Sequence, residues 1–439
     1  MKSTSSFSEI NMIITGNTTL QKTTHYKVVL PFYLYAAVAF LLSCLLLFIF
    51  SDAFQLHYFN PHTLAITHLM ALGWGTMMIL GASHQLVPVL IEGKLYSNRL
   101  ALLSFVLAGL GIPLLVWGFY TFNMGWPAQW GAIVLNLGIV AYLLNLGMSM
   151  AKSSTRSVYA AFILAAICWL LLTTGLGALL VFNFTYELLS SNSLTYLPLH
   201  AHMGIAGWFL MLVFGVGARL IPMFLISKYT NEKLLWTVFG CLNLGLITFI
   251  AFSLCGHPVL LRIIPPLLVT AGISLFGYYC RKAYEQRIRK QGDNPMKVSL
   301  LSVAMMVLPL LFLLILVVLM SYTGDHNRLV LLYGFCIFFG WLTAIILGMT
   351  FKTLPFIVWN KVYHQRAGKG KTPSPKDLFS NRQFNWMSIS YVTGFSCFAF
   401  GLFLQEGQLL KAGAVLLIAA AFLYNLNILK IIWHKPASI

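Results

Sequence analysis

Long apolar runs separated by short polar connections dominate the chain. A helix that crosses a bilayer needs about 20 predominantly apolar residues, and about twelve such runs occur. They begin near Val28, Ile66, Leu100, Trp130, Val158, Met203, Leu234, Leu260, Val298, Val330, Met387 and Leu410. No connection between them is long enough for a soluble domain. The pattern predicts an all-α integral membrane protein with one membrane domain, residues 28–435, after a polar cytoplasmic tail, residues 1–27.

The second, sixth and tenth runs share a signature of three residues. In each, a tryptophan is followed by glycine after seven residues and by proline after fourteen. The sets are Trp74, Gly81, Pro88; Trp208, Gly215, Pro222; and Trp341, Gly348, Pro355. The tryptophans lie 134 and 133 residues apart (208 − 74 and 341 − 208). We interpret the signature residues as packing and kink positions.

The repeat predicts the architecture of the bundle. Each period contains four runs, so the repeated units keep one orientation in the membrane. We therefore expect about twelve transmembrane helices in three pseudo-symmetric four-helix arcs around an axis along the membrane normal. The repeat units are roughly residues 28–157, 158–297 and 298–435.

Composition and charge agree with a membrane protein. Hydrophobic residues make up 59% of the chain and charged residues 9%, against about 25% charged residues in globular domains. The net charge of +18 is interpreted as an orientation marker, because Lys and Arg concentrate on the cytoplasmic side of membranes. This interpretation predicts a protein of the bacterial inner membrane with both termini in the cytoplasm. The positive charge is then no sign of nucleic-acid binding, and no nucleic acid is expected as a partner. The stretch before Lys27 predicts no cleaved signal peptide.

Four histidines of the second and sixth runs are the candidates for chemistry. They are His62, His68, His200 and His202. Ionisable residues inside a membrane are costly and mark functional sites. His68 and His202 occupy the same repeat position, six residues before their tryptophans, whereas the tenth run has Phe335 there. The alternative is that each imidazole is buried and bonded to a carbonyl or a hydroxyl.

The spacing of the pair in the sixth run separates its two side chains. Residues two apart on a helix point about 200° apart, so His200 and His202 face different sites. The tenth run has Tyr333 at the position of His200. His84 lies 16 residues beyond His68, about 24 Å deeper, and is expected to belong to no shared site.

The segment His200-Ala-His202-Met-Gly204-Ile-Ala-Gly207-Trp208 resembles a helix of a known family. With the Gly and Pro that follow, it is similar to the tenth helix of C-family haem–copper oxidase subunit I, which carries an HxHxGxxGW segment. Twelve helices in three arcs are also similar to that family. The resemblance implies that His200 binds a high-spin haem and His202 a low-spin haem. It implies for His68 either the second low-spin ligand, from its place in the chain, or a copper ligand, from its spacing.

The chain also differs from the family pattern. The HxH pair lies in the sixth run, not in the tenth, and no His-His pair completes a copper site. We therefore expect a divergent, haem-binding relative with a b-type haem between His68 and His202. His200 would offer a ligand to a second haem or metal, with His62 as support. Such a protein would handle oxygen or nitric oxide, with electrons from a cytochrome or a quinol, and whether it is an oxidoreductase stays open.

Two other classes of protein remain open. One is a haem-free transporter whose histidines bind copper or zinc, and the other is a sensor or assembly factor on the same scaffold. No Asp or Glu lies at a membrane midplane, which disfavours redox-linked proton pumping. Arg219 and Lys352, each three residues before a signature proline, are expected to extend to the membrane surface.

Overall fold

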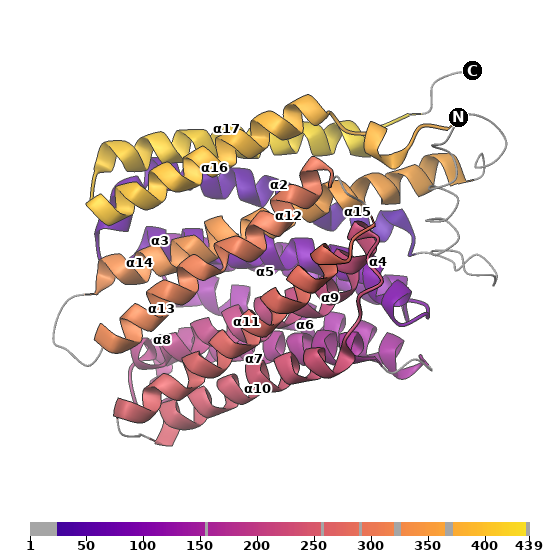
Figure 1. Cartoon of the computed structure of the whole chain (residues 1–439). Helices are drawn as coiled ribbons and strands as arrows, with labels where there is room; N and C mark the ends of the chain where they lie inside the picture. The colour runs from indigo at the N-terminus through magenta and orange to yellow at the C-terminus, as the bar shows by residue number, and fades with distance from the viewer. Residues whose placement is uncertain are drawn as a thin grey trace.

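The computed structural model describes residues 24–153, 157–255, 259–288, 292–319, 326–364 and 372–435. Within these ranges, twelve helices are long and apolar enough to cross a membrane, and no strand forms beyond one isolated bridge. Nine spans are α2 (Tyr26–Ile49), α5 (Asn98–Tyr120), α6 (Trp126–Ala151), α7 (Val158–Tyr186), α10 (Glu232–Cys255), α11 (Ile264–Glu285), α12 with α13 (Asn294–Met305 and Val307–Leu319), α16 (Asn381–Leu404) and α17 (Gly407–Ile432). The predicted all-α membrane fold is confirmed (Figure 1). Most of the predicted tail lies outside the described residues.

The three signature-bearing spans form the centre of the bundle. They are α3–η2–α4 (Pro61–His68, Leu69–Thr76, Met77–Leu90), α8–η3–α9 (Ser193–His202, Met203–Leu210, Met211–Leu225) and α14–η5–α15 (Asn327–Phe335, Cys336–Leu342, Thr343–Tyr363). In the most apolar 18-residue stretch of each of these spans, 72–83% of the residues are buried, against 22–50% in the nine other spans. We call these three spans the inner helices. The other nine pack around them.

Each inner helix has a π-helical segment at the same place in the repeat. The segments η2, η3 and η5 begin 134 and 133 residues apart (203 − 69 and 336 − 203), and each contains the signature tryptophan. The Trp74 Nε1–H donates to Thr343 Oγ1 at 3.1 Å, and the Trp208 Nε1–H donates to Thr76 Oγ1 at 3.0 Å. Both threonines lie two residues after their own tryptophan, where the sixth span has Leu210. Each of these hydrogen bonds joins one inner helix to the next around the axis.

The signature glycines let neighbouring spans approach closely. A Cβ added to Gly81 would lie 2.5 Å from the Cβ of Phe32, and a Cβ added to Gly215 would lie 2.5 Å from the Cβ of Phe162. Carbon atoms in contact are about 3.5–4.0 Å apart, so neither position has room for a side chain. This geometry supports the interpretation of the glycines as packing residues.

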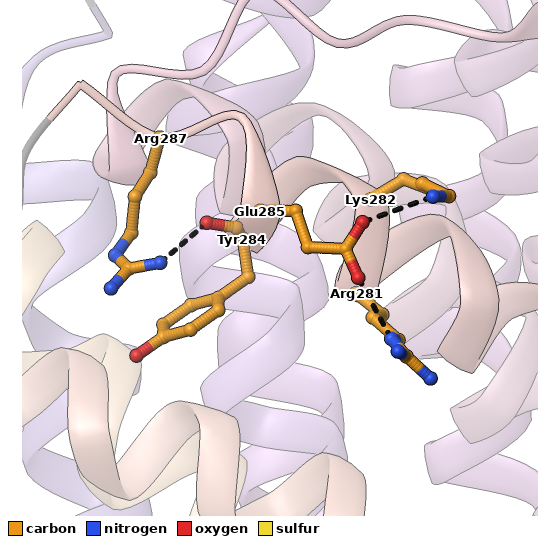
Figure 2. A network of polar contacts seen from close by, with 5 residues as sticks. All are labelled: Arg281, Lys282, Tyr284, Glu285 and Arg287. Carbon is orange, nitrogen blue, oxygen red and sulfur yellow. Dashed lines mark hydrogen bonds and ion pairs between the residues drawn. The ribbon is translucent and has the colours of Figure 1, made fainter.

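The two ends of the bundle differ in their side chains. The basic end is the end at which α2 begins, and its connections carry lysines such as Lys94, Lys152 and Lys228. Figure 2 shows part of this end, where Glu285 pairs with Arg281 and Lys282 at 2.9 and 3.0 Å. The opposite end, on the left in Figure 1, is the histidine end, where α3, α8 and α14 begin. Exposed tryptophans occur toward both ends, namely Trp117, Trp126 and Trp130, and Trp236, Trp386 and Trp433, as is usual at membrane–water interfaces.

Lys352 and Arg219 differ in their exposure: Arg219 is exposed, whereas Lys352 is largely buried and paired with a carboxylate at the basic end. The Nζ of Lys352 forms an ion pair with Asp293, and the lysine side chain is only 10% exposed. The other Asp293 oxygen, Oδ1, accepts from the backbone N–H of Met296 at 3.2 Å and so caps α12. Asp293 lies outside the apolar runs and 59 residues away in the chain, so the sequence pattern around Lys352 carried no sign of it.

Asp293→Asn is expected to destabilise the fold by roughly 2 kcal/mol. Removing one partner of a fully buried pair costs about 3–5 kcal/mol, and the partial exposure of Asp293, 33%, reduces that figure. Asn keeps the helix cap, so the loss reports on the charge of the Asp293 carboxylate. The double variant Asp293→Asn/Lys352→Met should unfold at a higher temperature than the single variant in detergent. A double variant that is no more stable than the single one would contradict a buried ion pair.

Candidate functional site

His68 is the last residue of α3, next to a π-helical segment, a feature that occurs often at functional sites. Its ring Nδ1 lies 2.8 Å from the carbonyl oxygen of Leu64. A carbonyl only accepts hydrogen bonds, so Nδ1 carries the proton and donates. The lone pair of the other nitrogen, Nε2, is therefore left for a ligand.

His200 of α8 is held in the same tautomer by a neighbouring helix. Its Nδ1–H donates to the carbonyl oxygen of Thr173 in α7 at 3.0 Å. One turn along α7, Gly177 makes room for the ring, because a Cβ there would lie 2.8 Å from Cε1 of His200. The α7 backbone thus orients this imidazole and leaves its Nε2 lone pair free of the carbonyl.

His68 and His200 form a pair between the second and sixth spans. Their ring centres are 6.2 Å apart, and the ring planes are inclined by only 18°. The ring of Phe119 in α5 packs on His68 with the centres 4.4 Å apart. Both imidazoles are half-buried inside the bundle.

His202 faces a different inner helix. Its Nδ1–H donates to the carbonyl oxygen of Pro198 at 2.7 Å, so its Nε2 accepts from the hydroxyl of Tyr333 in α14 at 3.2 Å. Phe249 of α10 packs on the same ring, with the centres 5.3 Å apart. His200 and His202 therefore point to two different sites, as their spacing predicts.

The structure does not form the expected pair of His68 and His202. These residues occupy equivalent positions of a cyclic repeat, so each points the same way around the axis, toward the next inner helix. On that helix, each contacts the residue eight positions before the signature tryptophan. His68 therefore contacts His200, and His202 contacts Tyr333. By the same rule, the third interface carries Phe335 and Ile66, and neither of these is a ligand.

His62 and His84 lie outside these pairs. His62 stacks on Phe50 with ring centres 3.9 Å apart and contacts Tyr120. His84 is fully buried in the half of the bundle nearer the basic end, between Phe32 and Tyr142. In the described part of the chain, no group of three or more His, Cys, Asp or Glu residues could hold a metal ion. A metal at the His68–His200 pair would thus have two protein ligands.

The sequence pattern identifies Tyr333 but does not predict its hydrogen bond with His202. It gives no sign of Thr173, Gly177 and Phe119, which contact His200 and His68. The repeat marks Tyr333, because it occupies the position of His200. No pattern marks the other three, which lie on outer spans. Comparison with models of protein families and with curated proteins finds no match to this chain.

Proposed function

We propose that this multi-pass membrane protein binds a b-type haem, which His68 and His200 would hold through their Nε2 atoms. The observation that carries the proposal is the 6.2 Å between their ring centres. A bond from a metal to an imidazole nitrogen is about 2 Å long, and the ring centre lies about 1 Å behind that nitrogen, so two axial imidazoles have their centres roughly 6 Å apart. The observed spacing of the two ring centres agrees with that value.

The chain's own residues would orient the ligands and exclude water. The carbonyl groups of Leu64 and Thr173 hold both imidazoles in the tautomer that leaves Nε2 for a metal, and such hydrogen bonds make an imidazole a stronger ligand. Phe119 covers His68 with an apolar ring. A bound haem supplies one-electron chemistry, which the protein tunes through its axial ligands and surroundings.

His202 is the candidate ligand of a second haem or metal. Its Nε2, which accepts the hydrogen bond from Tyr333, would hold that group. A second haem there would supply the chemistry of binding oxygen or nitric oxide. This part of the proposal rests on the single pair His202–Tyr333, and it reverses the roles that the resemblance to haem–copper oxidase subunit I implies for His200 and His202.

The resemblance also suggests the cellular setting. We propose a bacterial inner membrane with the basic end and both termini in the cytoplasm, and a cytochrome or a quinol as the electron donor. The alternative function is a haem-free copper-handling protein, such as a transporter, sensor or assembly factor. Two nitrogen ligands at this spacing also suit a single copper ion, and imidazole is a usual copper ligand.

A reduced-minus-oxidised absorption spectrum tests the proposal. The full chain is purified after haem-replete expression, and haem, copper and zinc are measured in the same sample. We expect the α-band of a b-type haem and about one haem or more per chain. Stoichiometric copper without that band would support the alternative. Protein that binds neither haem nor copper would contradict both the haem proposal and the copper alternative.

A further inference from the structure

A pocket of about 370 Å³ lies at the basic end of the first repeat. The connection between α4 and α5 and the end of α6 form its wall. The wall residues are Gly93, Lys94, Leu95, Tyr96, Ser149 and Lys152. Three membrane spans end around this pocket, so it lies at the level of the lipid head groups. The histidine pairs lie at the opposite end of the bundle.

Hydrogen bonds hold the wall of the pocket in place. The backbone N–H of Tyr96 donates to Ser149 Oγ at 2.9 Å. The next N–H along the chain, that of Ser97, donates to Asn145 Oδ1 at 2.9 Å. Both bonds join the connection between α4 and α5 to the end of α6, so the pocket belongs to the packed structure of the bundle.

The charged groups of the wall are cations. Lys94 and Lys152 each bring an ammonium group, and neither forms an ion pair with a carboxylate in the described part of the chain. The Nζ of Lys152 lies 4.5 Å from the ring centre of Tyr96. Glu92 is the one acidic residue of the connection, and it is not part of the wall. Two positive charges around one pocket favour an anionic occupant.

A buried donor without a partner lies behind the wall. Ser149 Oγ donates to the main-chain oxygen of Asn145 at 2.7 Å, so Asn145 adjoins the pocket one turn along α6. The side chain of Asn145 is fully buried, and its Nδ2 has no hydrogen-bond partner in the described part of the chain. A buried donor that is left unpaired is costly. Around this pocket, the protein thus supplies more donors than acceptors.

The third repeat contains the same construction with all its groups bonded. Residues 95–99 (LYSNR) recur as residues 378–382 (LFSNR), 283 positions later (378 − 95). The N–H of Ser380 donates to Asn427 Oδ1 at 2.9 Å, as the N–H of Ser97 does to Asn145. The Nδ2 of Asn427 also donates, to the carbonyl oxygen of Ser380 at 3.1 Å. The unpaired amide is therefore particular to the first repeat.

The third repeat also fills the place of the pocket with its own side chains. Lys152 corresponds to His434 (434 − 152 = 282, the same offset as 427 − 145), and the Nε2 of His434 lies 2.9 Å from the hydroxyl of Tyr363. Tyr96 corresponds to Phe379, and the exposed fraction is 44% for the tyrosine and 6% for the phenylalanine. Of these two repeats, the first leaves the place open and lines it with cations.

We propose that this pocket binds a phosphate group through Lys94 and Lys152. Ammonium groups form charge-assisted hydrogen bonds with phosphate oxygens, and basic pockets between transmembrane helices hold the head groups of anionic lipids. A phospholipid head group and a free phosphate ion offer the same kind of oxygen to the two lysines. The position of the pocket, at the ends of three spans, favours the phospholipid. The proposal does not depend on haem at the histidines.

Native mass spectrometry of the full chain in detergent tests the proposal. The protein is titrated with phosphatidylglycerol and, for comparison, with phosphatidylcholine, which has no net charge. Binding of inorganic phosphate is followed separately by phosphorus NMR. We expect a single phosphatidylglycerol to bind more tightly than phosphatidylcholine. Binding of inorganic phosphate that depends on the two lysines, without such a lipid site, would identify free phosphate as the ligand. Binding of neither ligand would overturn the proposal.

A double variant and a control of equal charge locate the site. Lys94→Gln/Lys152→Gln should bind phosphatidylglycerol roughly 25-fold more weakly, because each lysine close to an anionic lipid is worth about fivefold in affinity. Both side chains are exposed, so this variant should fold normally. The control, Lys228→Gln/Lys233→Gln, removes the same charge elsewhere at the basic end and should leave the affinity unchanged. An equal loss in both variants, or no loss in the first, would contradict the assignment to this pocket.

Discussion

His200→Ala is expected to abolish the low-spin spectrum of the proposed haem, whereas His202→Ala is expected to retain it. His200 lies opposite His68, and a haem that loses one of two axial imidazoles no longer has the bis-histidine spectrum. The Nε2 of His202 instead accepts a hydrogen bond from a tyrosine hydroxyl on another inner helix. The measurement is a reduced-minus-oxidised spectrum together with the haem content of each variant.

The matched control is His62→Ala, which removes another imidazole from the histidine end. His62 packs on Phe50 and Tyr120, so its loss should leave the spectrum intact. Gly177→Val should act like His200→Ala although the histidine remains, because a side chain at position 177 would occupy the place of the His200 ring. Loss of the spectrum in His202→Ala with retention in His200→Ala would instead restore the pairing of His68 with His202.

Gly215→Ala is expected to destabilise the bundle by about 3 kcal/mol, the upper range for overpacking. The added Cβ would lie 2.5 Å from the Cβ of Phe162. That atom is fixed to the backbone of α7 and cannot rotate away, so α7 and α9 must move apart. We expect a lower yield of monodisperse protein and a lower unfolding temperature in detergent.

Gly217→Ala provides the comparison on the same helix. Its Cβ would meet Phe276 at 3.4 Å, and alanine favours a helix over glycine by about 1 kcal/mol. This variant should therefore be as stable as the wild type or slightly more stable. Equal unfolding temperatures for the two variants would show that the close approach of α7 and α9 does not determine stability.

The spans and their repeat could be predicted because both signals are local in the sequence. An apolar run of sufficient length defines a span, and the tryptophan spacing identifies the inner helices. The starts of the second and sixth spans could not be placed from apolarity. They begin at Pro61 and Ser193, before the apolar runs, because the side chains of Asn60 and Asn192 cap the first turn.

Which residues the histidines contact could not be predicted from the sequence. Helical spacing separates His200 from His202, but the direction in which the arcs follow one another decides which of them meets His68. A ring of three arcs can be closed in either sense with the same hydrophobic pattern. The contact of His202 with Tyr333 follows from that sense, as does the position of His68 opposite His200 and not opposite His202.

The hydrogen bonds between inner helices have a consequence for the order of assembly. Chains fold from the N-terminal side during synthesis, and His68 and His200 are both present once the sixth span has been made. Trp74 must wait for Thr343, 269 residues later in the chain, and His202 must wait for Tyr333, 131 residues later. The His68–His200 pair can therefore form on a half-synthesised protein, whereas the circle of inner helices closes only when the last arc enters the membrane.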